Sequence, residues 1–223
     1  MIYEKLATYY DMFVDDKLVE EYVKIIQVHH KSGSVLDLGT GTGPLAIELS
    51  KKGYHVTATD ISTEMLEVAY NNATIDDVKI NFFIHDILDT VNRDYDIICM
   101  SSDVINYLQN EAEVSKALKN VYLAMNTDSV FLFDSIRPQY IHKLSGHTEE
   151  VLLKDDVMRW SAVLTNIDNQ MKHTIQIGNH IESHLQMAYT LKDMTVMLKS
   201  NHIEVIKKIK YEDRILYVCK KEL

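Results

Sequence analysis

The chain has 223 residues, 46% hydrophobic and 25% charged, which is typical of a soluble globular protein with one substantial core. No apolar run reaches the roughly 18 to 20 residues of a membrane-spanning helix, and the N-terminus lacks a basic segment followed by an apolar one, so we expect a cytoplasmic protein. The net charge is −10, and the first 135 residues carry 22 acidic against 10 basic side chains, which disfavours binding to nucleic acid.

Segments with strand and helix periodicity alternate through the first 135 residues. Asp15 and Asp16 can cap a first helix, and Pro44 suits the first turn of a second. Such alternation implies parallel strands joined by right-handed crossovers. The expected strands are residues 34–38, 54–59, 78–83, 96–101 and 130–133, and the expected helices are residues 44–52, 63–71 and 111–125.

The pattern changes after Pro138. Three strand-like runs separated by turn residues predict antiparallel hairpins, and one more helix and two more strands follow. These runs are residues 157–164, 171–177 and 180–187, then a helix at 191–200 and strands at 205–210 and 215–219. We therefore expect a single α/β domain over residues 1–223. It has a doubly wound, mostly parallel, Rossmann-like sheet of seven strands, with a small antiparallel insertion at about 139–189 before the last helix and strands.

The most specific motif is the segment Val35-Leu36-Asp37-Leu38-Gly39-Thr40-Gly41-Thr42-Gly43. It places three of the seven glycines at the carboxyl end of the first strand, where open α/β sheets bind ligands. A dinucleotide fingerprint needs its third glycine at position 44, which is Pro44. The Asp37 carboxylate would repel a pyrophosphate but attract the ammonium group of a methionine moiety, which favours S-adenosylmethionine over NAD. The alternative is an ordinary tight turn that Asp37 caps. The cofactor contacts expected here are Asp37, Gly39, Thr40 and Gly41.

Two further acids follow the next strands. Asp60 closes the second strand, where a carboxylate can accept hydrogen bonds from both hydroxyls of an adenosine ribose. Asp86 follows the third strand and is placed to accept from an adenine amino group. Ile61, Met65 and Ile87 would then flank the adenine ring, although apolar residues at these places are commonly only core.

These motifs resemble the class I S-adenosylmethionine-dependent methyltransferases. The D-x-G-x-G-x-G turn, Asp60 and the segment His85-Asp86-Ile87 carry the resemblance. A closer likeness to the YqeM-like group of small bacterial methyltransferases rests on three shorter segments, which are Tyr10-Asp11, the residues Asp-Val-Ile-Asn-Tyr-Leu at 103–108, and Glu-Ser-His-Leu-Gln at 182–186 with Tyr189. The resemblance implies an enzyme that uses S-adenosylmethionine and a methionine pocket that includes Ser101. The chain departs from the group at Ser101-Ser102, where bulkier residues are expected, and the resemblance supplies no substrate.

Methyl transfer from a sulfonium is an in-line displacement, so a catalytic base is optional. Glu182, His184 and Gln186 alternate and share one face of a strand. If that face covers the methyl group, His184 is the candidate base; otherwise the three residues form an exposed polar face. Asp103 is expected either to orient a nucleophile or to cap a turn, and the same two alternatives apply to Asn106. Tyr10 closes over the cofactor or packs an N-terminal helix.

The acceptor is the least defined part of the prediction. No Pro-Pro-aromatic segment follows the fourth strand and no Pro-Cys pair exists, which favours a small molecule over a nucleic-acid base. The competing functions are an NAD-linked oxidoreductase and a non-catalytic S-adenosylmethionine-binding module. Histidine spacing matches no metal site, so none is expected. Exposed edges of the inserted strands make a homodimer an expectation.

Overall fold

A computed structural model describes residues 6–154 and 156–222, and its main feature is a seven-stranded sheet. The strand order is β10-β11-β5-β4-β1-β2-β3. The five strands from β1 to β5 run parallel, whereas β11 pairs antiparallel with β5 and β10 antiparallel with β11. The predicted α/β fold with a mostly parallel seven-stranded sheet is confirmed. The strands are β1 Ser34–Leu38, β2 His55–Asp60, β3 Asn81–Ile84, β4 Tyr95–Met100, β5 Met125–Ile136, β10 Ile203–Lys210 and β11 Arg214–Lys221.

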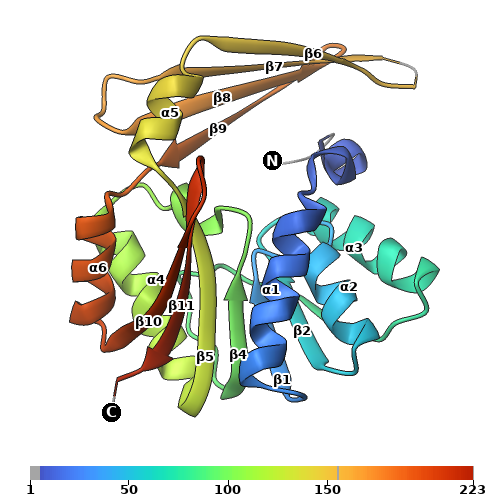
Figure 1. Cartoon of the computed structure of the whole chain (residues 1–223). Coiled ribbons are helices and arrows are strands. Elements are labelled where there is room, and N and C mark those ends of the chain that lie inside the picture. The colour runs from blue at the N-terminus through green and yellow to red at the C-terminus, as the bar shows by residue number, and fades with distance from the viewer. Residues whose placement is uncertain (1–5, 155, 223) are drawn as a thin grey trace.

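Helices cover both faces of this sheet (Figure 1). On one face lie α1 Asp16–His29, α2 Pro44–Lys51 and α3 Thr63–Ile75, and on the other lie α4 Glu111–Ala124 and α6 Leu191–Ser200. A polar side chain caps α1 as the sequence predicts: Asp15 accepts the N–H groups of Lys17 and Leu18. Each face has its own apolar core. In the core against α4 and α6 the rings of Phe131, Phe133 and Tyr217 stack.

A second sheet lies beyond the carboxyl ends of the parallel strands, and we call it the cover sheet (Figure 1). Its four antiparallel strands are β6 His147–Leu152, β7 Val157–Leu164, β8 Gln170–Ile177 and β9 His180–Met187. The helix α5 Pro138–Leu144 leads into it. The sequence predicted β7, β8 and β9 but missed α5 and β6, because neither segment shows a clear apolar periodicity.

Short 3-10 helices connect the two sheets. These are η1 Leu6–Phe13 and η2 Val104–Tyr107. The side-chain amide of Asn106 in η2 donates to the Met187 carbonyl at the end of β9 at 2.7 Å. Gln109 just beyond η2 donates to the Leu185 carbonyl at 2.9 Å, so the cover sheet is fastened to the segment that follows β4. None of the helices that the structure describes is both long and apolar enough to cross a membrane.

Candidate active site

The glycine turn connects β1 to α2 through backbone that side chains would obstruct. Gly39 has a φ of +71°, and a Cβ atom on it would lie 2.6 Å from Cγ2 of Val104 in η2. The backbone N–H of Thr40 donates to the Thr59 carbonyl at 2.8 Å, which holds the turn against the end of β2. Glycine is therefore required at position 39 both by the left-handed backbone and by the close approach of η2.

Asp37 is fully buried below this turn. Its Oδ2 atom accepts the hydroxyl proton of Thr40 at 2.7 Å, whereas Oδ1 is buried without a hydrogen-bond partner among residues 6–154 and 156–222. Burial raises the pKa of Asp37 to about 6; Asp60 adds to the rise and the Thr40 hydrogen bond opposes it. Because a buried carboxylate oxygen without a partner is unfavourable, this position suits a cationic or hydrogen-bond-donating ligand group.

Asp60 closes β2 and ties the turn to the start of α3. It accepts the N–H of Gly41 at 2.9 Å and that of Ser62 at 2.9 Å, and burial raises its pKa. The neighbouring Ile61 side chain is 57% exposed and is therefore available to cover a bound ring, whereas Met65 is 1% exposed and lies in the core. The two apolar residues predicted to flank an adenine on this side thus occupy different environments.

Asp86 stands beside Asp60 because β2 and β3 are neighbours. His85 donates its N–H to the Asp60 carbonyl at 3.0 Å, and Asp86 Oδ1 accepts the Leu88 N–H at 2.9 Å. Ile87 packs partly buried against the core below α4. The structure therefore brings Asp37, Asp60 and Asp86, which the sequence singled out, to one edge of the sheet.

A strained turn follows β4 and carries Asp103. After the half-buried Ser101, Ser102 and Asp103 have φ angles of +60° and +56°, which non-glycine residues rarely adopt. Asp134 of β5 stabilises this turn, because its buried carboxylate accepts both of their N–H groups, at 2.8 and 3.0 Å. The same carboxylate accepts Nη1 of Arg214 at 2.8 Å.

The Asp103 side chain points to a partly enclosed position and is 18% exposed. Arg214 contacts Oδ1 at 3.3 Å, and the side-chain amide of Gln186 donates to Oδ2. Burial, with the nearby Asp134, raises the pKa of Asp103 to about 7, although Arg214 and the Gln186 hydrogen bond oppose the rise. A carboxyl with this pKa can gain or lose a proton near neutral pH.

Glu182, His184 and Gln186 share the inner face of β9. Their exposed fractions are 7%, 4% and 5%, so the interpretation of an exposed polar face is wrong. Glu182 accepts the Leu6 N–H at 3.4 Å, which links this face to η1. The His184 ring lies 6.3 Å from the ring of Tyr107 in η2, in an edge-to-face arrangement. Burial lowers the pKa of His184, which favours the neutral imidazole that a base requires.

Tyr10 in η1 lies over the glycine turn. Its Cε1 atom is 3.7 Å from the place where a Cβ on Gly41 would stand. Burial and the charges of Asp103 and Asp60 raise its pKa well above the usual range. The ring is therefore close to the turn that carries Gly41 and is affected by the charge of Asp103.

Comparison with known proteins finds a family match for the segment that contains most of these residues. Residues 35–128 match the family model described as a methyltransferase domain. The match covers less than half of the chain, and this segment is similar to methyltransferase domains. It includes every cofactor-contacting residue predicted from the sequence, and Asp103, whereas Tyr10 and His184 lie outside it.

Two curated relatives are each similar to 60% of the chain. YqeM of Bacillus subtilis strain 168 is 31% identical over 137 residues, which are 60% of this chain and 55% of that protein. GWCH70_2453 of Geobacillus sp. strain WCH70 is 31% identical over 141 residues, which are 60% of this chain and 57% of that protein. Both are named as methyltransferases by inference. The chain thus spans little more than half the length of these curated relatives.

A solved structure extends the likeness to the whole fold. A S-adenosylmethionine-dependent methyltransferase from Clostridium acetobutylicum ATCC 824 superposes with a TM-score of 0.84 at 24% identity. The match covers 99% of both chains. The fold of the chain, cover sheet included, is therefore that of a known methyltransferase, and the predicted class I fold is confirmed.

Four residues outside the matched segment 35–128 were not predicted as site residues. Asp134 is an acid that follows the apolar run of β5, and Arg214 is an arginine in a charged turn; neither position has a motif. Trp160 and His173 belong to adjacent strands of the cover sheet. Asn106, for which a nucleophile-orienting role was considered, uses its amide on the backbone of Ile136 and Met187 instead.

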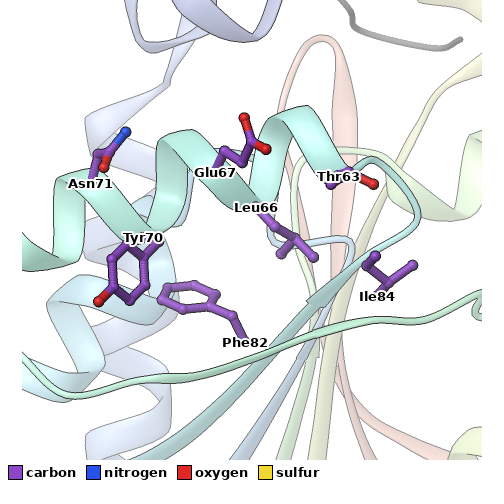
Figure 2. Close-up of a pocket in the computed structure, with 7 residues that line it drawn as sticks. All are labelled: Thr63, Leu66, Glu67, Tyr70, Asn71, Phe82 and Ile84. Atoms are coloured by element: carbon purple, nitrogen blue, oxygen red, sulfur yellow. The ribbon is translucent and has the colours of Figure 1, made fainter.

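A groove lies away from these residues, at the edge of the main sheet between α3 and β3 (Figure 2). It encloses about 450 Å³, and the rings of Tyr70 and Phe82 meet in it with centroids 6.4 Å apart. No predicted site residue lines it. The lining side chains are Thr63, Leu66, Glu67, Tyr70, Asn71, Phe82 and Ile84. Within the part of the chain that the structure describes, no group of three or more histidine, cysteine or acidic side chains is arranged to hold a metal ion.

Proposed function

We propose that the chain is a S-adenosylmethionine-dependent methyltransferase. The observation that carries this proposal is the buried Oδ1 atom of Asp37, which has no hydrogen-bond partner in the described chain and lies below the glycine turn. An ammonium group there would supply both the charge and the hydrogen bond that this oxygen lacks. A pyrophosphate would be repelled, which counts against an NAD-linked oxidoreductase.

The residues around Asp37 fit the rest of this donor. Asp60 is placed for the ribose hydroxyls and Asp86 for the adenine amino group, while Ile61 and Ile87 offer apolar surface to the ring. S-adenosylmethionine supplies an electrophilic methyl group on a sulfonium. Tyr10 lies over Gly41 and would exclude water from the donor, because its ring covers the turn from above.

The acceptor side is formed by the strained turn and the cover sheet. Asp103, with its pKa near 7, would hold or accept the proton of the nucleophile, and His184 is a second candidate for that task. Glu182, His184 and Gln186 are all nearly buried under the cover sheet. Such enclosure suits a small molecule better than a folded protein or a nucleic acid, and we propose a small-molecule acceptor.

Calorimetric titration of the purified chain with S-adenosylhomocysteine, S-adenosylmethionine and NAD tests the donor. Micromolar binding of the first two without binding of NAD is the expected result. Binding of NAD alone would overturn the proposal. Tight binding of S-adenosylmethionine with no methyl transfer to any fraction of a metabolite extract would instead favour a non-catalytic binding module.

Two further features, a cytoplasmic location and a homodimer, are proposed from the sequence alone. A cytoplasmic location is tested by fractionation of cells that express the natural protein. A homodimer is tested by light scattering, in which the mass of a single 25.7 kDa chain would contradict it.

A further inference from the structure

We propose that Trp160, His173 and Gln186 form a relay of positioning residues that holds the Asp103 carboxylate in one orientation toward the methyl acceptor. The inference rests on the proposed function, because it assigns Asp103 to the acceptor side. The relay crosses three strands of the cover sheet and ends on the strained turn after β4. It therefore connects the position of the cover sheet to the orientation of a carboxylate beside the main sheet.

Three hydrogen bonds in series carry the relay. The indole Nε1 of Trp160 donates to Nδ1 of His173 at 3.2 Å. Nε2 of His173 lies 2.9 Å from Oε1 of Gln186. The Gln186 amide nitrogen then donates to Oδ2 of Asp103. His173 and Gln186 each use the two ends of their polar group on two different neighbours.

The direction of the series follows from its first member. An indole N–H can only donate, so Nδ1 of His173 must accept and the proton of the neutral ring must be on Nε2. That proton is donated to Oε1 of Gln186, which turns the NH₂ group of the amide toward Asp103. A donor consequently faces the carboxylate, and the flipped amide would place two oxygens against each other.

Packing keeps His173 neutral and in place. Its ring lies nearly parallel to the Trp160 indole, with centroids 5.7 Å apart and planes 8° apart. Burial lowers the pKa of His173, and the facing His184 adds to this effect, whereas the Gln186 hydrogen bond opposes it. A protonated ring would direct a second N–H at the indole N–H, so the relay requires the neutral form.

The opposite side of the Asp103 carboxylate is also fixed. Arg214 of β11 contacts Oδ1 at 3.3 Å, and Asp134 accepts the Asp103 backbone N–H. The main sheet therefore fixes one oxygen and the cover sheet the other. Because the Gln186 amide donates to the ionised carboxylate, it stabilises the charged form of Asp103.

The test measures the pKa of Asp103 by carbon NMR of the side-chain carboxyl in the full chain, with the signal assigned by its loss in Asp103→Asn. In Gln186→Leu the pKa is expected to rise by roughly 1 unit, because the donor to the carboxylate is removed. His173→Phe, which removes the support of that amide, is expected to shift it in the same direction. His173→Gln retains an N–H donor, so the pKa of Asp103 in this variant should equal that of the unmodified chain.

A matched control is Gln176→Leu, since Gln176 is a half-buried glutamine of β8 whose side-chain amide donates to the Gly178 carbonyl. It should leave the Asp103 pKa unchanged. An unshifted pKa in both relay variants would overturn the proposal and leave these residues a purely structural role. Nitrogen NMR of His173 in the unmodified chain needs no variant to fold, and a proton on Nδ1 would equally overturn it.

Calorimetry with S-adenosylhomocysteine separates this inference from the function on which it rests. The relay variants should bind this probe as the unmodified chain does, since no relay residue belongs to the donor site. Loss of binding in the variants would overturn the positioning role, because it would show that these residues are needed for the structure of the whole site and not only for the orientation of Asp103. If the unmodified chain itself fails to bind S-adenosylhomocysteine, the proposed function fails. The pKa of Asp103 in the variants still shows whether Gln186 and His173 act on this carboxylate.

Discussion

A Cβ atom on Gly39 would lie 2.6 Å from Cγ2 of Val104. Gly39 belongs to the turn after β1, and Val104 begins the 3-10 helix that follows Asp103 after β4. The turn proposed to bind the donor and the segment proposed to face the acceptor are therefore in direct contact at the carboxyl edge of the sheet. No atom larger than hydrogen fits between them.

Gly39→Ala is expected to lower the free energy of unfolding by roughly 2 to 4 kcal/mol, from the left-handed backbone and from overpacking together. Gly53→Ala is the matched control, because Gly53 has a φ of +88° with nothing within 4 Å of a Cβ. It should lose only the backbone part, about 1 to 2 kcal/mol. Urea denaturation measures both, and equal losses would show that the contact with Val104 is unimportant. Adding Val104→Ala to Gly39→Ala should recover part of the stability.

The pH dependence of donor binding should report Asp37. Its pKa of about 6 means that the carboxyl is protonated below this pH in the free protein, whereas an ammonium group selects the ionised form. Affinity for S-adenosylhomocysteine is therefore expected to fall by roughly tenfold per pH unit below 6 and to be level above 7. Asp37→Asn should weaken binding by roughly 10- to 100-fold and remove this pH dependence, as calorimetry between pH 5 and 8 will measure.

The exposed Asp94 provides the control for that titration. Asp94→Asn removes one negative charge from the same part of the chain without touching the turn, and should leave both affinity and pH dependence unchanged. A pH profile that survives in Asp37→Asn would assign the titration to another group, such as Asp60, whose pKa burial also raises.

Asp134→Asn is expected to destabilise the chain by roughly 3 to 5 kcal/mol, because it leaves the Arg214 charge with less compensation and points an amide at backbone N–H donors. Thermal and urea unfolding measure this loss. Asp128→Asn, an exposed change in the same strand β5, should be nearly neutral. Two losses of similar size would contradict the role of Asp134 in the turn at Ser102 and Asp103.

Asn106→Ala should loosen the cover sheet. The Asn106 side chain is fully buried, accepts the Ile136 N–H at 3.0 Å and donates to the Met187 carbonyl, so its removal leaves backbone groups unsatisfied at roughly 1 to 3 kcal/mol each. Hydrogen exchange is expected to accelerate in β9 more than in β1 or β2. Asn71→Ala, on the exposed surface of α3, should change neither region, and uniform acceleration would contradict a local role for Asn106.

The sequence predicted those elements whose apolar pattern repeats. The first strand is confirmed at residues 34–38, and the last helix at residues 191–200. The fifth strand was predicted as residues 130–133 but extends over Met125–Ile136, because its polar ends find tertiary partners: the Ser129 hydroxyl donates to the Tyr95 carbonyl. The strand β6 was missed because it is exposed along most of its length and has two adjacent glutamates at its centre.

The donor side of the site was more predictable than the acceptor side. Asp37, Asp60 and Asp86 each end or follow a strand of the parallel sheet, and parallel topology alone brings such residues to one edge. The contacts of Asp103 with Gln186 and Arg214 instead join residues 83 and 111 positions apart. Pairs of polar side chains at such separations leave no periodic pattern in a single sequence.

The family match ends at residue 128, and the cover sheet begins only at His147. The pocket proposed for the methyl donor is thus formed by one continuous stretch of chain. The cover sheet, proposed to lie over the acceptor, comes from a later stretch and contacts the first through Gln186 and the residues of η2. Under the proposed function, changes in the cover sheet would alter the acceptor side while leaving the segment proposed to bind the donor in place. The two stretches of chain can therefore be varied separately by a protein engineer.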